Sequence, residues 1–215
     1  MPAALEEVAR PIIIGRSSSH FTRVTRIFAA EMRIGYSFRV VRDLMSSDPG
    51  DYGGNPALRI PVLQTSRGTW FGALNVCREL WRQSSPRPHV VWPEDLDEPV
   101  LANAQELVLQ AMATEVSLIM SRLGDASSEG NAHQAKLRTG LLNMMSWLEE
   151  NAKTVLGALP PRRDLSFLEV SLFCLVTHLE FRGVLPTAPY SELNAFCQRF
   201  ATRASIGEAL YRFDT

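Results

Sequence analysis

The sequence predicts an N-terminal α/β domain followed by an all-helical domain. Short runs rich in β-branched and aromatic residues occur at residues 12–14, 38–41 and 62–63, and such runs largely disappear after residue 95. Between the two regions, prolines at positions 86, 88 and 93 disfavour a continuous helix or strand. We therefore expect one domain at residues 1–83, a linker at residues 84–94, and a second domain at residues 95–215.

The first domain is expected to alternate strands with helices. A strand at residues 11–14 and a helix at residues 19–34, ended by Gly35, precede a second strand at residues 36–44. This order suggests a parallel strand pair with a helical crossover. The pattern then predicts an irregular connection at 46–55, a hairpin made of 61–66 and 69–71 around Arg67–Gly68, and a closing helix at 73–81.

The helix predicted at residues 19–34 is amphipathic. Its apolar side is formed by Phe21, Val24, Ile27, Phe28 and Ile34. Arg23 and Arg26 point away from this side, which indicates a solvated face or, as the alternative, attraction of an anionic ligand.

The second domain shows helical spacing throughout. Ser166 and Glu169 have the S-x-x-E spacing of a capping box at the start of one of its helices. That helix is apolar nearly all the way round, so it should be the buried axis of the domain. The expected helices cover residues 101–123, 137–156, 167–179, 189–200 and 205–211.

Composition limits the possible partners. With 22 basic and 23 acidic residues, the net charge of −1 supplies no general field for a polyanion, so we expect no nucleic-acid partner. The N-terminus has neither signal-peptide nor transit-peptide character, and no apolar run approaches the ~20 residues of a membrane span. We expect a cytoplasmic protein without a membrane partner.

The three cysteines, Cys77, Cys174 and Cys197, lie far apart and within apolar helical patterns. An odd number cannot all pair within one chain, so we interpret them as reduced core thiols. The histidines show no metal-ligand spacing, and we expect no metal site.

The order of elements and three local sequences resemble the glutathione S-transferase family over essentially the whole chain. Residues 19–27, SHFTRVTRI, look like the turn and first helix of the family's serine-type classes. Residues 55–63, NPALRIPVL, resemble the family's N-P-x-x-x-I/V-P-x-L segment, whose second proline is cis. Residues 166–183 are similar to the family's buried sixth helix, with Glu169 in place of the usual capping aspartate.

The resemblance implies a thioredoxin-like N-terminal domain, glutathione as co-substrate, conjugation of its thiol to a small hydrophobic electrophile, and a homodimer. A thiol with a pKa near ~8.5 is only a few per cent thiolate at neutral pH. A hydroxyl donor and the positive end of a helix favour the thiolate. Ser19 matches the family's catalytic serine by its distance to Arg26–Ile27, with Ser17 and Ser18 as fallback donors. The other interpretation of Ser19 is a simple N-cap.

Three further positions belong to the expected ligand site. Pro61, if cis, either leaves the backbone of Ile60 open to an extended peptide ligand or only sets the turn before the strand. His20 replaces the proline that usually follows the serine, and it is either an acid or base or an inert surface residue.

One departure from the family pattern concerns the start of the helix at residues 73–81. The family usually carries Glu-Ser there, whereas this chain has Gly72 and Ala73, or Ala73 and Leu74 in the other alignment. Backbone amides at that helix start could still bind a carboxylate. The departure motivates an alternative function, a non-catalytic binding or interaction module with a changed ligand. Reduction by a nucleophilic cysteine is disfavoured because residues 17–19 contain none.

Overall fold

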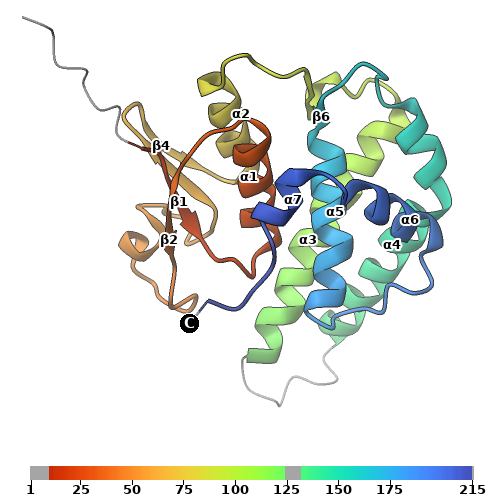
Figure 1. Cartoon of the computed structure of the whole chain (residues 1–215). Helices are drawn as coiled ribbons and strands as arrows, with labels where there is room; N and C mark the ends of the chain where they lie inside the picture. The colour runs from red at the N-terminus through yellow and green to blue at the C-terminus, as the bar shows by residue number, and fades with distance from the viewer. Residues whose placement is uncertain (1–9, 124–131, 215) are drawn as a thin grey trace, which may run out of the picture. The chain divides into compact units, whose positions relative to one another are not determined.

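The computed structural model describes residues 10–123 and 132–214, and the chain divides into two compact units (Figure 1). The first unit contains the chain up to Arg87 together with the segment from Gly207 onward, and the helical unit runs from Pro88 to Ile206. Residues 207–214 thus group with the first unit, although their position in the sequence had assigned them to the helical domain. The contacts that hold them there involve arginines of the first unit, as described below.

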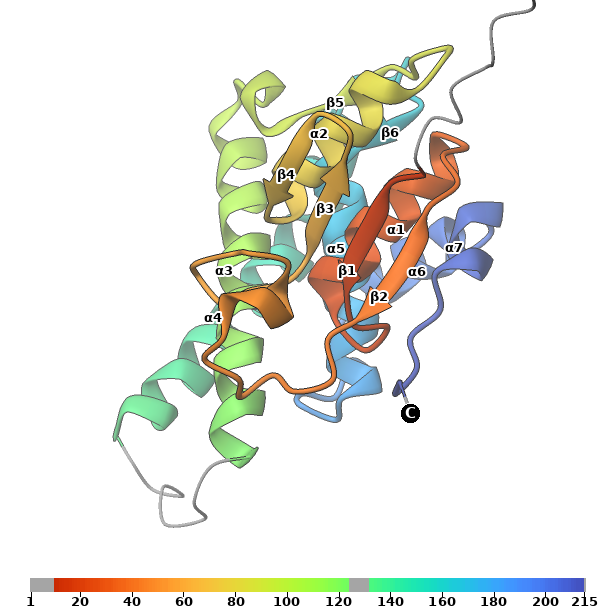
Figure 2. The same cartoon turned by 90° about the vertical axis from the view of Figure 1, so that its left-hand side faces the viewer.

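The first unit is built on a four-stranded sheet in the order β2-β1-β3-β4. The central strand β1 (Ile12–Gly15) runs parallel to β2 (Ser37–Val40) and antiparallel to β3 (Val62–Thr65), which forms a hairpin with β4 (Gly68–Phe71). The parallel pair and the hairpin are confirmed. Figure 2 shows the four strands in front of α1 (His20–Glu31) and α2 (Ala73–Gln83).

Both faces of the sheet are covered, which explains why β1 is a continuous run of isoleucines. Ile14 and Val62, which are paired in register, form a small core with Tyr52 of the short helix η1 (Pro49–Tyr52). Side chains alternate between the faces of a strand, so Ile13 points to the opposite face. There it is fully buried, as are Ile27 and Phe28 of the amphipathic helix α1.

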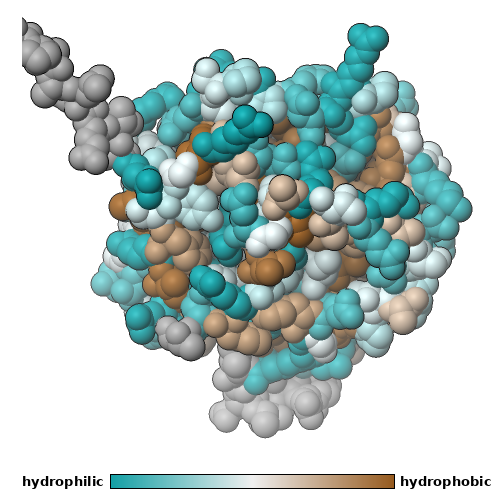
Figure 3. Space-filling view, in the orientation of Figure 1, coloured by the Kyte–Doolittle hydropathy of each residue, from teal (hydrophilic) through white to brown (hydrophobic). Residues whose placement is uncertain are grey.

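The helical unit contains α3 (Pro99–Leu123), α4 (Ala132–Ala158), α5 (Phe167–Phe181), α6 (Ser191–Phe200) and the first residues of α7 (Ala204–Glu208). As predicted, α5 is buried on nearly all sides, with α3 and α6 packed against it. None of the described helices combines the length and apolarity needed to cross a bilayer. In the face shown in Figure 3, apolar residues form small groups among hydrophilic ones.

The residues of the expected linker contain regular structure. Val90–Val91 form β5, which pairs in parallel with β6 (Leu165–Ser166), and η2 (Pro93–Asp95) follows. Ser166 caps α5 by accepting a hydrogen bond from the Glu169 amide, at 3.4 Å. Only this half of the predicted capping box is present, because the Glu169 carboxylate pairs with Arg163 instead.

The three cysteines, Cys77, Cys174 and Cys197, are buried and none forms a disulfide among the described residues. The prediction of core thiols is confirmed.

Candidate functional site

Ser19 is the N-cap of α1, and its geometry suits both interpretations of this residue. Its hydroxyl oxygen accepts a hydrogen bond from the Thr22 amide at 3.3 Å, and its own amide donates to the Arg16 carbonyl at 3.1 Å. Capping uses a lone pair of the oxygen and leaves the hydroxyl hydrogen to donate to a ligand. N-capping and thiolate stabilisation are therefore compatible roles.

The turn before α1 is held tightly against the helix. A Cβ atom on Gly15, at the end of β1, would lie 2.4 Å from the Thr22 hydroxyl oxygen, so only glycine fits without a shift. The side chains of Ser17 and Ser18 are buried. Unlike Ser19, these two fallback donors do not lie at the cap position.

A residue from the end of the chain completes this turn. The amide of Ser17 donates to the carboxylate of Asp214 at 2.7 Å, and the Asp214 side chain is only 6% exposed. Asp214 was not among the residues expected from the sequence. No local pattern reveals the pair, because its members are separated by 197 positions.

Residues 207–214, which we call the C-terminal segment, lie along α1 (Figure 1). Arg23 donates to the Ala209 carbonyl at 2.8 Å, and its guanidinium lies 4.1 Å from the centre of the Tyr211 ring. Arg26 donates to the Glu208 carbonyl at 2.9 Å. The prediction of a solvated arginine face is wrong for Arg23, which is 4% exposed, because the segment covers it.

His20 is the first residue of α1 and is buried, so the expectation of a surface histidine is wrong. Its ring meets the ring of Phe21 edge-on, with centroids 4.7 Å apart. The side chain is therefore shielded from water.

Ile60 and Pro61 form a cis peptide bond, as the resemblance implies. Within the part of the chain that the structure describes, no hydrogen bond involves the peptide N–H or C=O of Ile60. The Pro61 carbonyl accepts from the Gly72 amide at 3.1 Å, which ties the start of β3 to the start of α2.

The start of α2 has no side-chain cap. Gly72 occupies the N-cap position with φ 81°, a backbone conformation that residues other than glycine rarely adopt. Ala73, the first helical residue, is buried. The first amides of a helix lack intrahelical partners, so those following Gly72 can bind an anionic group.

The register of the sheet brings these segments to one end of the first unit. Ile14 pairs with Val62, and Val62 pairs with Phe71. The end of β1, the start of β3 and the end of β4 therefore lie side by side. Each of these strand ends is next to one segment of the expected site. These segments are the turn at residues 17–20 after β1, the bond between Ile60 and Pro61 before β3, and the helix start at Gly72–Ala73 after β4. All the expected site residues thus lie at one edge of the sheet. The N-termini of α1 and α2 lie at the same edge.

No protein-family model matches the chain, and no curated protein matches it in sequence. Several solved structures resemble it. A glutathione S-transferase from Methylobacillus flagellatus KT with GSH bound has a TM-score of 0.75 at 17% identity, covering 94% of this chain and 100% of that one. One from Methylobacterium radiotolerans JCM 2831, in complex with glutathione sulfonate, has a TM-score of 0.74 at 17% identity, covering 96% and 97%.

A glutathione transferase family member from Pseudomonas fluorescens Pf-5 with bound glutathione gives a TM-score of 0.75 at 15% identity, covering 94% of this chain and 99% of that one. Identities this low establish the fold alone. Together with the mixed sheet of the first unit and the helices that follow it, they show that the chain has the glutathione S-transferase fold, a thioredoxin-like N-terminal domain followed by a helical domain.

Proposed function

We propose that the first unit binds glutathione and activates its thiol for conjugation to a small hydrophobic electrophile. The observation that carries the proposal is the convergence of Ser19, the Ile60–Pro61 bond and the start of α2 at one edge of the sheet. Solved structures with the same fold contain glutathione, which supports this ligand.

Ser19 is the proposed donor to the sulfur. The Thr22 amide orients its hydroxyl oxygen, and the hydroxyl hydrogen is left for the thiolate. The positive end of α1, a helix of 12 residues, acts in the same direction. Both effects lower the thiol pKa, so the thiol proton passes to water. The sulfur then bonds to the electrophilic carbon while the leaving group departs with its electron pair.

The rest of the peptide is proposed to use backbone groups. The N–H and C=O of Ile60 would pair with an extended ligand like an added strand. The amides that follow Gly72 would receive a carboxylate at the N-terminus of α2. Gly72 and Ala73 supply neither a carboxylate nor a hydroxyl. The affinity of this chain for glutathione should therefore be lower than it would be with a Glu-Ser pair at these positions.

The first experiment is calorimetric titration of reduced glutathione, followed by conjugation assays with an activated aryl chloride. Wild type should bind and conjugate, and Ser19→Ala should still bind but lose roughly a hundredfold in rate, a typical cost of removing one donor. Ser18→Ala is the matched control and should keep the rate. Absence of both binding at millimolar ligand and conjugation would contradict the proposal.

A gain-of-function variant tests the α2 subsite. The φ of Gly72 makes a glutamate there strained, so we choose Ala73→Ser, which adds a hydroxyl at the first helical position. It should tighten glutathione binding. We also propose a homodimer, as the resemblance to the glutathione S-transferase family implies, and light scattering would detect it as twice the mass of the chain.

The alternative function, a non-catalytic module with a changed ligand, also has support. Gly72 and Ala73 lack the carboxylate and the hydroxyl of the usual Glu-Ser pair. The Ser17 amide already donates its hydrogen bond to the carboxylate of Asp214. Glutathione binding by Ala73→Ser but not by the wild type would favour this alternative. Conjugation that disappears in Ser19→Ala would contradict it.

A further inference from the structure

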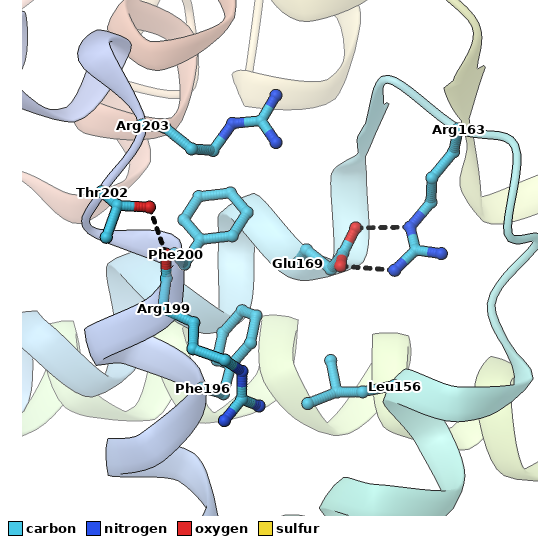
Figure 4. Close-up of a pocket in the computed structure, with 8 residues that line it drawn as sticks. All are labelled: Leu156, Arg163, Glu169, Phe196, Arg199, Phe200, Thr202 and Arg203. Carbon is cyan, nitrogen blue, oxygen red and sulfur yellow. Dashed lines mark hydrogen bonds and ion pairs between the residues drawn. The ribbon is translucent and has the colours of Figure 1, made fainter.

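The helical unit contains a cavity of about 360 Å³, whereas the site proposed above belongs to the first unit (Figure 4). Six of the residues that line the cavity are Arg163, Glu169, Phe196, Arg199, Phe200 and Arg203. Arg163 donates to both carboxylate oxygens of Glu169, at 2.7 and 2.6 Å, so these two charges offset each other. Phe196 and Phe200 are 5% and 7% exposed, which leaves little ring surface for a ligand. The C-terminal segment has a more specific arrangement, because its contacts lead to Ser19.

The C-terminal segment is held by α1 and runs antiparallel to it. Along the segment, the contacts pass from Arg26 to Arg23 and then to Ser17, so its residues advance toward the N-terminus of the helix. The third of these contacts is the 2.7 Å bond from the Ser17 amide to the Asp214 carboxylate. The side chain of Asp214 is 6% exposed, and its other oxygen lies 3.9 Å from Nε of Arg212. The segment thus brings a nearly buried carboxylate to the turn that precedes α1.

One peptide group links this carboxylate to Ser19. The N–H of Ser17 and the C=O of Arg16 belong to the same planar peptide unit. Its N–H donates to Asp214 at 2.7 Å, and its C=O accepts from the Ser19 amide at 3.1 Å. Because the unit is planar, Asp214 also sets the orientation of the carbonyl that holds Ser19. Polarisation acts in the same direction, since donation to an anion makes the carbonyl a stronger acceptor.

The turn has few other restraints. The hydroxyl oxygen of Ser17 is buried and has no hydrogen-bond partner within residues 10–123 and 132–214, so Ser17 makes only the bond to Asp214 there. On the helix side, the Thr22 amide donates to the Ser19 hydroxyl oxygen at 3.3 Å. This bond is long, because N–H···O distances in proteins centre near ~2.9 Å. The direction of the Ser19 hydroxyl therefore depends on the turn as well as on the cap.

We propose that Asp214 is a positioning residue for Ser19 and acts through the peptide group between Arg16 and Ser17. The inference rests on the proposed role of Ser19 as the donor to the glutathione sulfur. By its charge alone, Asp214 would oppose a nearby thiolate and raise the thiol pKa. By holding the turn, it directs the Ser19 hydroxyl and favours the thiolate. These two effects have opposite signs, so experiment can separate them.

The test compares Asp214→Ala and Asp214→Asn in the conjugation of glutathione to an activated aryl chloride. Asp214→Ala should lower kcat roughly tenfold, which is less than the roughly hundredfold loss expected when the Ser19 hydroxyl is removed. The KM for glutathione should change little, because the proposed binding groups at Ile60 and after Gly72 belong to other segments. The pH at which kcat/KM reaches half its plateau should rise, since a misdirected hydroxyl stabilises the thiolate less. Asp214→Asn keeps an oxygen acceptor and should recover most of the rate.

The control for these variants is Leu210→Ala, which lies in the same segment and replaces a side chain that is 59% exposed. Its kinetics and pH profile should match those of the wild type, and an effect as large as that of Asp214→Ala would overturn the proposal. A shift of the pH profile to lower pH in both Asp214 variants would overturn it too, because Asp214 would then act by its charge. So would a loss of stability in Asp214→Ala with an unchanged pH profile, which is the result of a purely structural role.

Thr22 provides a readout that needs no ligand. Its amide donates to the Ser19 hydroxyl oxygen, so amide hydrogen exchange at Thr22 in the free protein reports on the position of that oxygen. Exchange should accelerate in Asp214→Ala and stay unchanged in Leu210→Ala. If the wild type does not bind glutathione, the proposed function fails, whereas the Thr22 amide still decides whether Asp214 positions Ser19. A Thr22 amide that stays equally protected in Asp214→Ala would overturn the inference.

Discussion

Removing the Asp214 carboxylate should release the C-terminal segment from the turn before α1. The Ser17 amide donates to this carboxylate at 2.7 Å, and Ser17 as a residue is only 1% exposed. A hydrogen bond to a charged group contributes about 1.5–3 kcal/mol net. Asp214→Ala should therefore ease local opening by about 2 kcal/mol, which corresponds to roughly a 30-fold increase in the open population.

Amide hydrogen exchange at Ser17, followed by NMR, measures this opening directly. Asp214→Asn keeps an oxygen acceptor without the charge, so its exchange rate should fall between those of the wild type and the alanine variant. Leu210→Ala is the matched control within the same segment, because Leu210 is 59% exposed and contributes little packing. Its Ser17 amide should exchange as slowly as in the wild type.

The reasoning would be refuted by a Ser17 amide that stays equally protected in Asp214→Ala. The same conclusion would follow if Leu210→Ala accelerated exchange as much as Asp214→Ala, because the loss would then reflect general loosening of the segment. Arg23 and Arg26 hold the earlier part of the segment by their own bonds to Ala209 and Glu208. Opening should therefore be confined to its last residues.

Three further predictions concern stability. Gly15→Ala should lower the free energy of unfolding by about 1–3 kcal/mol in urea titrations, because its new methyl group would overlap Thr22. His178→Leu should cost about 3–5 kcal/mol, since it removes the 2.8 Å bond to the fully buried Glu115, and replacing both residues by leucine should recover much of the loss. Burial raises the pKa of Tyr190 above that of an unfolded tyrosine. The neutral side chain therefore contributes its full stability below about pH 10, and this contribution is lost as pH rises through the folded-state pKa. Tyr190→Phe should reduce this alkaline loss of stability in thermal melts.

Local patterns in the sequence predicted most of the elements. Ser19 and Ser166 were correctly identified at the starts of α1 and α5, because capping involves residues only three positions apart. Element ends were less accurate. The first helix was expected to continue to residue 34, but α1 ends at Glu31 and Arg33 takes a φ of 54°. Gly35 was the expected stop signal, yet Arg33 is the residue that adopts the left-handed conformation after the helix.

The expected site residues could be found from sequence because they lie in short motifs next to strand ends. Their proximity then depends on strand register, which places Ile14, Val62 and Phe71 side by side. The sequence also showed that Gly72 and Ala73 depart from the family's Glu-Ser pattern. The φ of Gly72, which disfavours a glutamate there, could only be seen in the structure.

By itself, the sequence determined the order of elements, the two-part organisation and the segments that flank the candidate site. Periodicity and capping act over a few residues, so they can be recognised in a single chain. Only the tertiary structure decided that Arg23 binds the Ala209 carbonyl 186 positions away, that Asp214 completes the Ser17 turn, and that Arg199 and Arg203 line a cavity. A backbone carbonyl or amide accepts or donates in the same way whatever side chain it carries, so such long-range partners leave no local pattern to detect.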